Sequence, residues 1–145
     1  ESGEFLRSMN VRDGMVVKMA IQAGFQIGII TGGTSEGVKK RFTLLGVTEY
    51  YSGMGEKWPA MQAFLQRTGL PPTAVCYMGD DLPDVPIFTR CGFAVAVPHA
   101  MPSVREHAHY VTARDGGHGA VRELAEFILA AQGHDFTGAP PPRAA

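Results

Sequence analysis

Three carboxylates are crowded into one short segment, and they give the clearest chemical signal in the sequence. The segment reads Ala74-Val-Cys-Tyr-Met-Gly-Asp-Asp-Leu-Pro-Asp84, so an apolar stretch ends at a glycine and Asp80, Asp81 and Asp84 follow within five residues. Like charges at this spacing repel one another and raise the pKa of at least one carboxyl group. A divalent, oxygen-seeking cation removes this repulsion, and we expect Mg²⁺. The alternative is a helix N-cap with solvated neighbours, which suits one aspartate better than three.

A second polar turn has the composition of a phosphate-binding site. Thr31 and Gly32 follow the apolar residues 27–30, and a hydroxyl with free backbone N–H groups at a helix start commonly binds phosphate. Such turns are frequent, so an ordinary loop stays open. Lys57 lies in a glycine-containing loop at another helix start, where the helix dipole disfavours a cation. An anionic partner would explain this lysine, and a solvated side chain is the alternative.

Two arginines are further candidates for binding an anionic substrate. Arg12 lies in the segment Asn10-Val-Arg-Asp-Gly14, and Arg122 follows a glycine-rich loop. Guanidinium groups bind carboxylates and phosphates through paired hydrogen bonds. For Arg122 an i,i+4 pair with Glu126 is equally open. For Asp13, beside Arg12, a plain helix cap is the favoured interpretation.

Strand-like and helix-like segments alternate along the chain and would position these turns. Strands are expected at residues 25–30, 49–52, 74–78, 92–97 and 109–111, and helices at 13–23, 35–45, 58–68, 84–89, 102–107 and 119–131. Residues 4–9 alternate weakly, as an exposed strand or hairpin arm would. The alternation predicts an α/β fold, with a mainly parallel sheet covered by helices. Because ligands collect at the carboxyl ends of such strands, Thr31 and the acidic turn should share a pocket.

Capping residues and glycines predict where the helices begin and end. Asp13 and Ser35 are the expected N-caps of the first two helices, and Gly24 ends the first. The apolar periodicity of the first and last helices places Met15 and Val121 on their apolar faces. Each of these helices should therefore cover the sheet with one face.

The composition defines the broad class of protein. The 145 residues, 45% of them hydrophobic, fit a single domain at residues 1–133 followed by a flexible tail at 134–145. Thirteen basic and fourteen acidic residues give a net charge of -1 without a basic block, which argues against nucleic acid or anionic membranes as partners. Neither the two cysteines nor the five histidines have zinc-site spacing. Without a signal-peptide pattern or a long apolar run, we expect a soluble cytoplasmic protein.

Three of these features resemble motifs II, III and IV of the haloacid dehalogenase superfamily phosphatases. In order along the chain they are the hydroxyl turn, the lysine before a helix and the Gly-Asp-Asp-x-x-Asp turn. More specifically, the chain resembles the 3-deoxy-D-manno-octulosonate 8-phosphate (KDO 8-phosphate) phosphatases from residue 3 to about residue 134. The segments that carry this resemblance are Asn10-Val-Arg-Asp-Gly14, Ile29-Ile-Thr-Gly32, Gly79-Asp-Asp-Leu82, Gly117-His-Gly-Ala-Val-Arg-Glu123 and Ala131-Gln-Gly133. The resemblance implies a capless, three-layer Rossmann-like fold and Mg²⁺-dependent hydrolysis of a sugar-acid phosphate. It also implies a homotetramer that acts in lipopolysaccharide precursor synthesis.

The matching motifs also imply a role for each site residue. Asp80 would bind Mg²⁺, Asp81 and Asp84 would support the metal shell, Thr31 and Gly32 would hold the phosphoryl group, and Lys57 would neutralise it. The metal and the lysine together would offset the charge on the phosphoryl oxygens.

Two departures from the family pattern bear on activity. The family commonly carries an arginine after Thr-Gly where this chain has Gly33, which leaves the sugar acid open. The family's first motif, Asp-x-Asp-Gly, supplies the nucleophile and the general acid/base, and no aspartate pair of this sequence matches it. The chain as given is therefore expected to be inactive and to lack the first strand. A truncated or missing N-terminal segment is favoured over an evolved pseudoenzyme.

The alternative function is a non-catalytic oligomerisation domain, similar to the C-terminal domain of acylneuraminate cytidylyltransferases.

Overall fold

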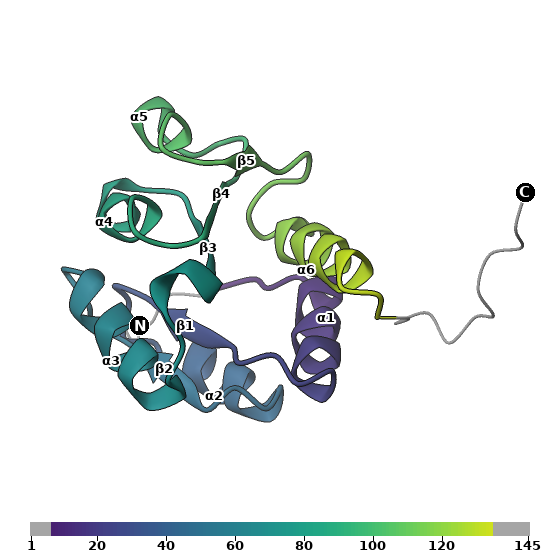
Figure 1. Ribbon diagram of the computed structural model, residues 1–145. Coiled ribbons are helices and arrows are strands. Elements are labelled where there is room, and N and C mark those ends of the chain that lie inside the picture. The colour runs from purple at the N-terminus through teal and green to yellow at the C-terminus, as the bar shows by residue number, and fades with distance from the viewer. Residues whose placement is uncertain (1–6, 135–145) are drawn as a thin grey trace, which may run out of the picture.

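Strands and helices alternate in the computed structural model, which describes residues 7–134. The elements are α1 (Val11–Gln22), β1 (Gly28–Ile30), α2 (Glu36–Leu44), β2 (Glu49–Tyr51), α3 (Trp58–Thr68), η1 (Pro72–Ala74), β3 (Cys76–Gly79), η2 (Leu82–Asp84), α4 (Val85–Phe88), β4 (Phe93–Ala96), α5 (Pro102–Arg105), β5 (Tyr110–Val111) and α6 (Ala120–Ala131). Every strand pair is parallel, and helices surround the strands (Figure 1). The predicted α/β fold is thus confirmed.

The strands form two groups. β1 pairs with β2, and β3, β4 and β5 form a separate sheet in that order. Within residues 7–134 no strand joins the two groups, so β1 and β3 each have one edge that pairs with no described strand. The alternation of elements predicts one continuous sheet, whereas the described strands form two sheets with a break between β1 and β3.

Helix α3 connects the two sheets through an apolar cluster. Phe64 of α3 is buried and packs closely on Gly28 of β1, where a β-carbon would lie 2.9 Å from the phenyl ring. The same cluster contains Val75 and Ile87 from the other half of the fold and contacts Tyr77 of β3. Burying a side chain of this size stabilises the fold by about 1.5–3 kcal/mol. The two sheets are thus held together by side-chain packing rather than by backbone pairing.

The capping prediction was right for α2 and wrong for α1. Ser35 caps α2 as expected. Asn10, rather than Asp13, caps α1, since its side chain accepts two backbone N–H groups of the first turn at 2.9 and 3.4 Å. Asp13 instead accepts the N–H groups of Arg122 at 2.8 Å and Gly119 at 3.3 Å, and so it caps α6. The packing of α1 against α6 brings this carboxylate to the other helix.

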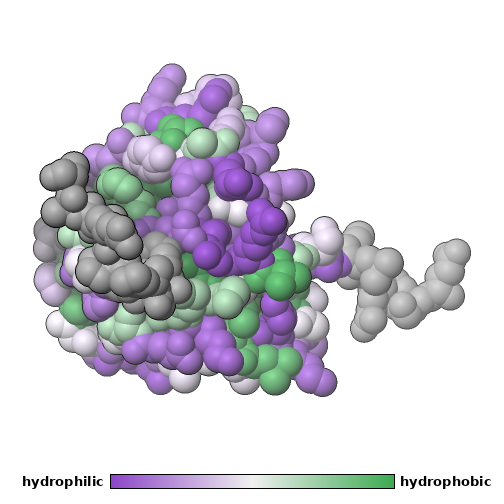
Figure 2. Space-filling view, turned by 90° about the vertical axis from the view of Figure 1, so that its right-hand side faces the viewer, coloured by the Kyte–Doolittle hydropathy of each residue, from purple (hydrophilic) through white to green (hydrophobic). Residues whose placement is uncertain are grey.

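The apolar faces of α1 and α6 are narrower than their periodicity predicts. Met15 is 59% exposed and Val121 is 38% exposed, whereas Val17 and Leu124 are buried. Figure 2 looks at the side of the molecule where α1 and α6 lie and shows apolar patches among polar side chains. These helices pack mainly on each other, so residues at the margins of the apolar stripes remain accessible.

Residues 7–10 lead into α1 without forming a strand. The strand predicted for residues 4–9 is therefore absent over its described part, while residues 4–6 lie outside the described residues. The tail predicted from residue 134 onward lies outside them as well, except for His134. No helix between residues 7 and 134 is long and apolar enough to cross a membrane.

Candidate phosphate and metal site

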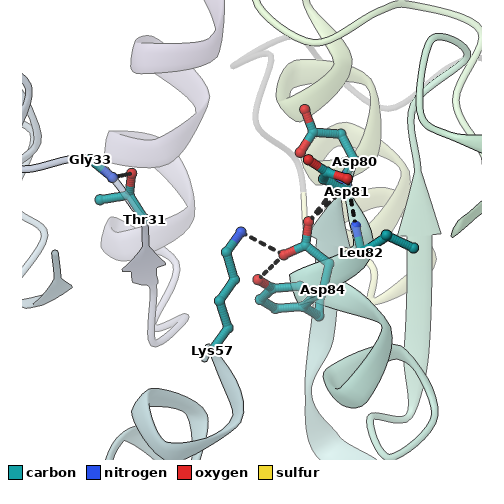
Figure 3. Close-up of polar contacts among 8 residues, drawn as sticks. Thr31, Gly33, Lys57, Asp80, Asp81, Leu82 and Asp84 are labelled. Carbon is teal, nitrogen blue, oxygen red and sulfur yellow. Dashed lines mark hydrogen bonds and ion pairs between the residues drawn. The ribbon is translucent and has the colours of Figure 1, made fainter. Parts of the chain in front are cut away.

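Asp84 is the centre of the acidic turn and is fully buried. Its Oδ1 accepts hydrogen bonds from Lys57 Nζ and from the Tyr77 hydroxyl, both at 2.6 Å. Its Oδ2 accepts the backbone N–H groups of Asp80 at 2.9 Å and Asp81 at 3.1 Å (Figure 3). Both carboxylate oxygens are thus satisfied by the protein, and Asp84 holds the lysine and the turn in one arrangement.

The turn after β3 closes tightly because its first residue is glycine. A β-carbon on Gly79 would lie 2.4 Å from Cγ of Asp84, so any side chain there would displace the buried carboxylate. Asp81 begins the short helix η2, where its Oδ1 accepts the N–H of Leu82 at 2.7 Å and forms a reciprocal capping box with Asp84. The capping alternative raised from the sequence therefore holds for Asp81.

Asp80 differs from the other two aspartates of the turn in its surroundings. Its side chain is exposed and takes part in no hydrogen bond or ion pair with another described residue, whereas the oxygens of Asp84 are occupied and Asp81 is turned toward its own helix. No group of three or more His, Cys, Asp or Glu side chains within residues 7–134 could hold a metal ion. Within the acidic turn, Asp80 is thus the carboxylate without a partner among residues 7–134, and the other two aspartates shape the turn that carries it.

The electrostatics of Asp84 favour its ionised form. Burial pushes the pKa of Asp84 upward, but the hydrogen bonds from Lys57 and Tyr77 outweigh burial, and the pKa is lowered overall. Burial and the neighbouring carboxylate of Asp84 raise the pKa of Tyr77, which stays protonated. The anionic partner predicted for Lys57 is therefore Asp84. Tyr77 was missed from the sequence, because its place in an apolar strand gives no sign of a polar contact.

The hydroxyl turn lies at the end of β1 and is tied to the loop that carries Lys57. Thr31 Oγ1 accepts the N–H of Gly33 at 3.1 Å, and the carbonyl of Thr31 accepts the N–H of Met54 at 3.1 Å. At Gly32 a β-carbon would lie 3.6 Å from the Met54 carbonyl oxygen, which is an ordinary contact. Figure 3 shows the Lys57 ammonium group between Thr31 and the acidic turn. That the two polar turns share a pocket remains a prediction.

The two predicted arginines lie apart from these turns. The Nε of Arg122 pairs with Glu126 on the same helix, which is the alternative raised from the sequence. Arg12 is exposed in the first turn of α1. Across the described range, no hydrogen bond or ion pair links either arginine to Thr31 or Lys57. Their assignment to substrate binding remains a prediction.

The arrangement suits a ligand that carries a phosphate group. Lys57 provides a cation that is fixed by a buried carboxylate, and Thr31 provides a hydroxyl in a tight turn. Asp80 provides an accessible carboxylate in the acidic turn that Asp84 holds. A cation and hydroxyl donors in a preorganised geometry are what a phosphoryl group requires.

Similarity to known proteins agrees with this geometry. Residues 46–124 match the family model of haloacid dehalogenase-like hydrolases. The 3-deoxy-D-manno-octulosonate 8-phosphate phosphatase of Escherichia coli K12 is 40% identical over 132 residues, which cover 91% of this chain and 70% of the relative.

Solved structures agree as well. The crystal structure of 3-deoxy-D-manno-octulosonate 8-phosphate phosphatase from Yersinia pestis aligns with a TM-score of 0.89 at 40% identity, covering 92% of this chain and 72% of that chain. The enzyme from Moraxella catarrhalis, determined with magnesium, phosphate and KDO, aligns with a TM-score of 0.87 at 34% identity, covering 92% of this chain and 77% of that chain. The chain therefore belongs to the haloacid dehalogenase-like hydrolases, within the family of 3-deoxy-D-manno-octulosonate 8-phosphate phosphatases.

Proposed function

We propose that this chain forms the phosphate- and metal-binding part of a phosphatase site for a sugar-acid phosphate of the KDO 8-phosphate type. The observation that carries the proposal is the buried Lys57–Asp84 pair, which fixes a cation between the hydroxyl turn and the acidic turn. Membership of the KDO 8-phosphate phosphatase family supports the substrate class.

Lys57 and Thr31 would bind the phosphoryl group. The ammonium of Lys57 has three N–H donors, of which one bond is made to Asp84, so the others can donate to phosphoryl oxygens. The hydroxyl of Thr31 accepts from Gly33 and can donate its own proton to the phosphate. Gly32 lets the backbone approach the ligand without a side chain in the way.

Asp80 would provide a ligand to Mg²⁺, with Asp81 and Asp84 supporting the turn. The fit rests on the chemistry of the donors, because an accessible carboxylate beside a phosphate site suits a hard, oxygen-seeking cation. Bound there, Mg²⁺ would supply positive charge that offsets the charge on the phosphoryl oxygens. A magnesium ion accompanies phosphate in the Moraxella catarrhalis structure.

We expect these 145 residues to bind the phosphate ester without turning it over. Covalent catalysis on phosphate requires a positioned carboxylate nucleophile, and the sequence contains no Asp-x-Asp pair. Within the described range, the carboxylate of Asp84 is buried and occupied, and that of Asp81 caps a helix. Binding and hydrolysis should therefore be separable in experiments on this chain.

Calorimetric titration with inorganic phosphate in the presence of Mg²⁺ tests the assignment. Thr31→Ala and Lys57→Gln should each weaken phosphate binding about tenfold, because each removes a hydrogen bond to a charged group. Thr43→Ala, at an exposed position of α2, is the matched control and should bind like the parent chain. Folding of each variant is checked by circular dichroism. Unchanged phosphate affinity in a folded Thr31→Ala variant would overturn the phosphate assignment and favour a non-catalytic role in assembly.

A further inference from the structure

The guanidinium group of Arg7 lies against the hydroxyl turn, although Arg7 is distant from that turn in the sequence. A β-carbon built on Gly33 would lie 3.3 Å from a terminal nitrogen of Arg7 and 3.6 Å from Thr31 Oγ1. Both groups are therefore on the side of Gly33 toward which a side chain would point. Because Gly33 has no side chain, the space beside the turn is available to Arg7.

The surroundings of Arg7 suit an anionic group on a ligand. Arg7 lines an open hollow of about 360 Å³ together with Ser8, Met9 and Val38. No carboxylate among the described residues lies within ion-pair distance of its guanidinium. The hollow thus contains a cation that residues 7–134 do not neutralise.

The positive charge of Arg7 also acts on a buried tyrosine hydroxyl. The Tyr50 hydroxyl is the one buried side-chain polar atom without a hydrogen-bond partner in the described range. Burial and the carboxylate of Glu36 raise the pKa of Tyr50, whereas the positive charge of Arg7 opposes the rise. An unpaired buried hydroxyl is costly, so Tyr50 has a hydrogen-bond donor that no described residue uses.

We propose that Arg7 binds the carboxylate of the sugar acid whose phosphate group Thr31 and Lys57 hold. This inference rests on the proposed function and adds a second anion-binding position to it. A sugar-acid phosphate has two anionic groups separated by its carbon chain. Arg7 lies beside Gly33 of the hydroxyl turn, and Lys57 is a separate cation held by Asp84. A guanidinium matches a carboxylate through two parallel hydrogen bonds. Arg7 would therefore select an acid over a neutral sugar phosphate.

Titrations with three ligands separate the carboxylate site from the phosphate site. KDO 8-phosphate carries both groups, unphosphorylated KDO carries the carboxylate, and glucose 6-phosphate carries the phosphate. Arg7→Gln should weaken binding of both KDO ligands about tenfold and leave glucose 6-phosphate unchanged, as expected for loss of one charged hydrogen-bonding group. Lys40→Gln removes an exposed lysine of α2 and is the charge-matched control.

A relocated arginine tests the position directly. Gly33 has no positive φ and its nearest neighbour is the flexible end of Arg7, so Gly33→Arg can be accommodated. In the Arg7→Gln background, Gly33→Arg should restore the binding of unphosphorylated KDO. Equal losses for KDO 8-phosphate and glucose 6-phosphate in Arg7→Gln, or no loss for unphosphorylated KDO, would overturn the inference.

The same titrations distinguish failure of the inference from failure of the proposed function. If the chain did not bind glucose 6-phosphate but Arg7→Gln weakened the binding of unphosphorylated KDO, the carboxylate site would stand and the phosphate assignment would fail. In the opposite case, Lys57→Gln would weaken the binding of glucose 6-phosphate, and Arg7→Gln would leave the affinity for all three ligands unchanged. The phosphate assignment would then stand and the carboxylate site would fail. Two-dimensional NMR adds a local readout, because unphosphorylated KDO should shift the Gly33 amide resonance in the parent chain and not in Arg7→Gln.

Discussion

At the scale of single residues, the site depends on how one buried carboxylate is shared. Asp84 binds Lys57 through one oxygen and the backbone of the acidic turn through the other. A change at Asp84 should therefore move the lysine and the turn together. Asp84 also positions the backbone of Asp80, whose carboxylate we propose as the ligand of the cation.

Asp84→Asn should lower the free energy of unfolding at pH 7 by about 2–3 kcal/mol. The substitution removes the negative charge of a buried pair and leaves the ammonium of Lys57 without its partner. Urea denaturation followed by circular dichroism measures the loss. Asp81→Asn changes an exposed aspartate of the same turn and should cost clearly less. Equal stability of Asp84→Asn and the parent chain would show that the pair contributes little.

The lowered pKa of Asp84 predicts how stability depends on acid. The carboxyl pKa is near 3.9 in unfolded chains and lower in the fold, where the hydrogen bonds from Lys57 and Tyr77 outweigh burial. The contribution of Asp84 is therefore complete above about pH 4 and is lost as the pH falls through the lower folded value. Urea midpoints measured between pH 7 and pH 2 should fall less steeply in Asp84→Asn than in the parent chain. Parallel acid profiles of the two proteins would contradict this prediction.

Asp80→Asn should weaken Mg²⁺ binding while leaving stability nearly unchanged, because its carboxylate is exposed and has no bond to another described residue. Calorimetric titration with Mg²⁺ in the presence of phosphate measures the effect. Glu56→Gln, at an exposed position in the Lys57 loop, serves as the control for charge. Identical Mg²⁺ affinity in Asp80→Asn and the parent chain would remove Asp80 from the metal site.

At the scale of elements, α1 and α6 depend on each other. Asp13 in the first turn of α1 accepts two N–H groups at the start of α6, whereas Asn10 caps α1 itself. The sequence predicted Asp13 as the cap of α1, and this was wrong, because the helix that Asp13 caps is decided by the packing of two helices distant in the chain. Ser35 was predicted correctly, since its capping bond is local.

Asp13→Ala should lower the free energy of unfolding by about 1 kcal/mol, as the loss of a helix cap usually does. The effect should concentrate in the first turn of α6, where the amides of Arg122 and Glu123 should exchange with deuterium faster than before. In Asn10→Ala, the matched loss of a cap, faster exchange should instead appear in the first turn of α1. Faster exchange confined to α1 in Asp13→Ala would show that Asp13 is a local cap after all.

At the scale of the whole molecule, the carboxyl ends of β1 and β3 carry the two polar turns on different sheets. Phe64 and the rest of the apolar cluster around α3 pack between these sheets and hold them together. The sequence alone predicted the α/β class and most element positions, because the alternation of strands and helices is a local signal. The shared pocket of Thr31, Lys57 and the acidic turn remains a prediction. The sequence did not predict the division into two sheets, since strand pairing is set by tertiary contacts.

The central claim is that these residues bind a sugar-acid phosphate, and calorimetric titration with KDO 8-phosphate and Mg²⁺ tests it directly, with phosphate release followed in the same sample. We predict saturable, Mg²⁺-dependent binding to the parent chain, about tenfold weaker binding to Lys57→Gln, and no release of inorganic phosphate. The absence of binding by a folded parent chain would contradict the claim. Steady release of phosphate that disappears in Asp80→Asn would contradict the separation of binding from hydrolysis.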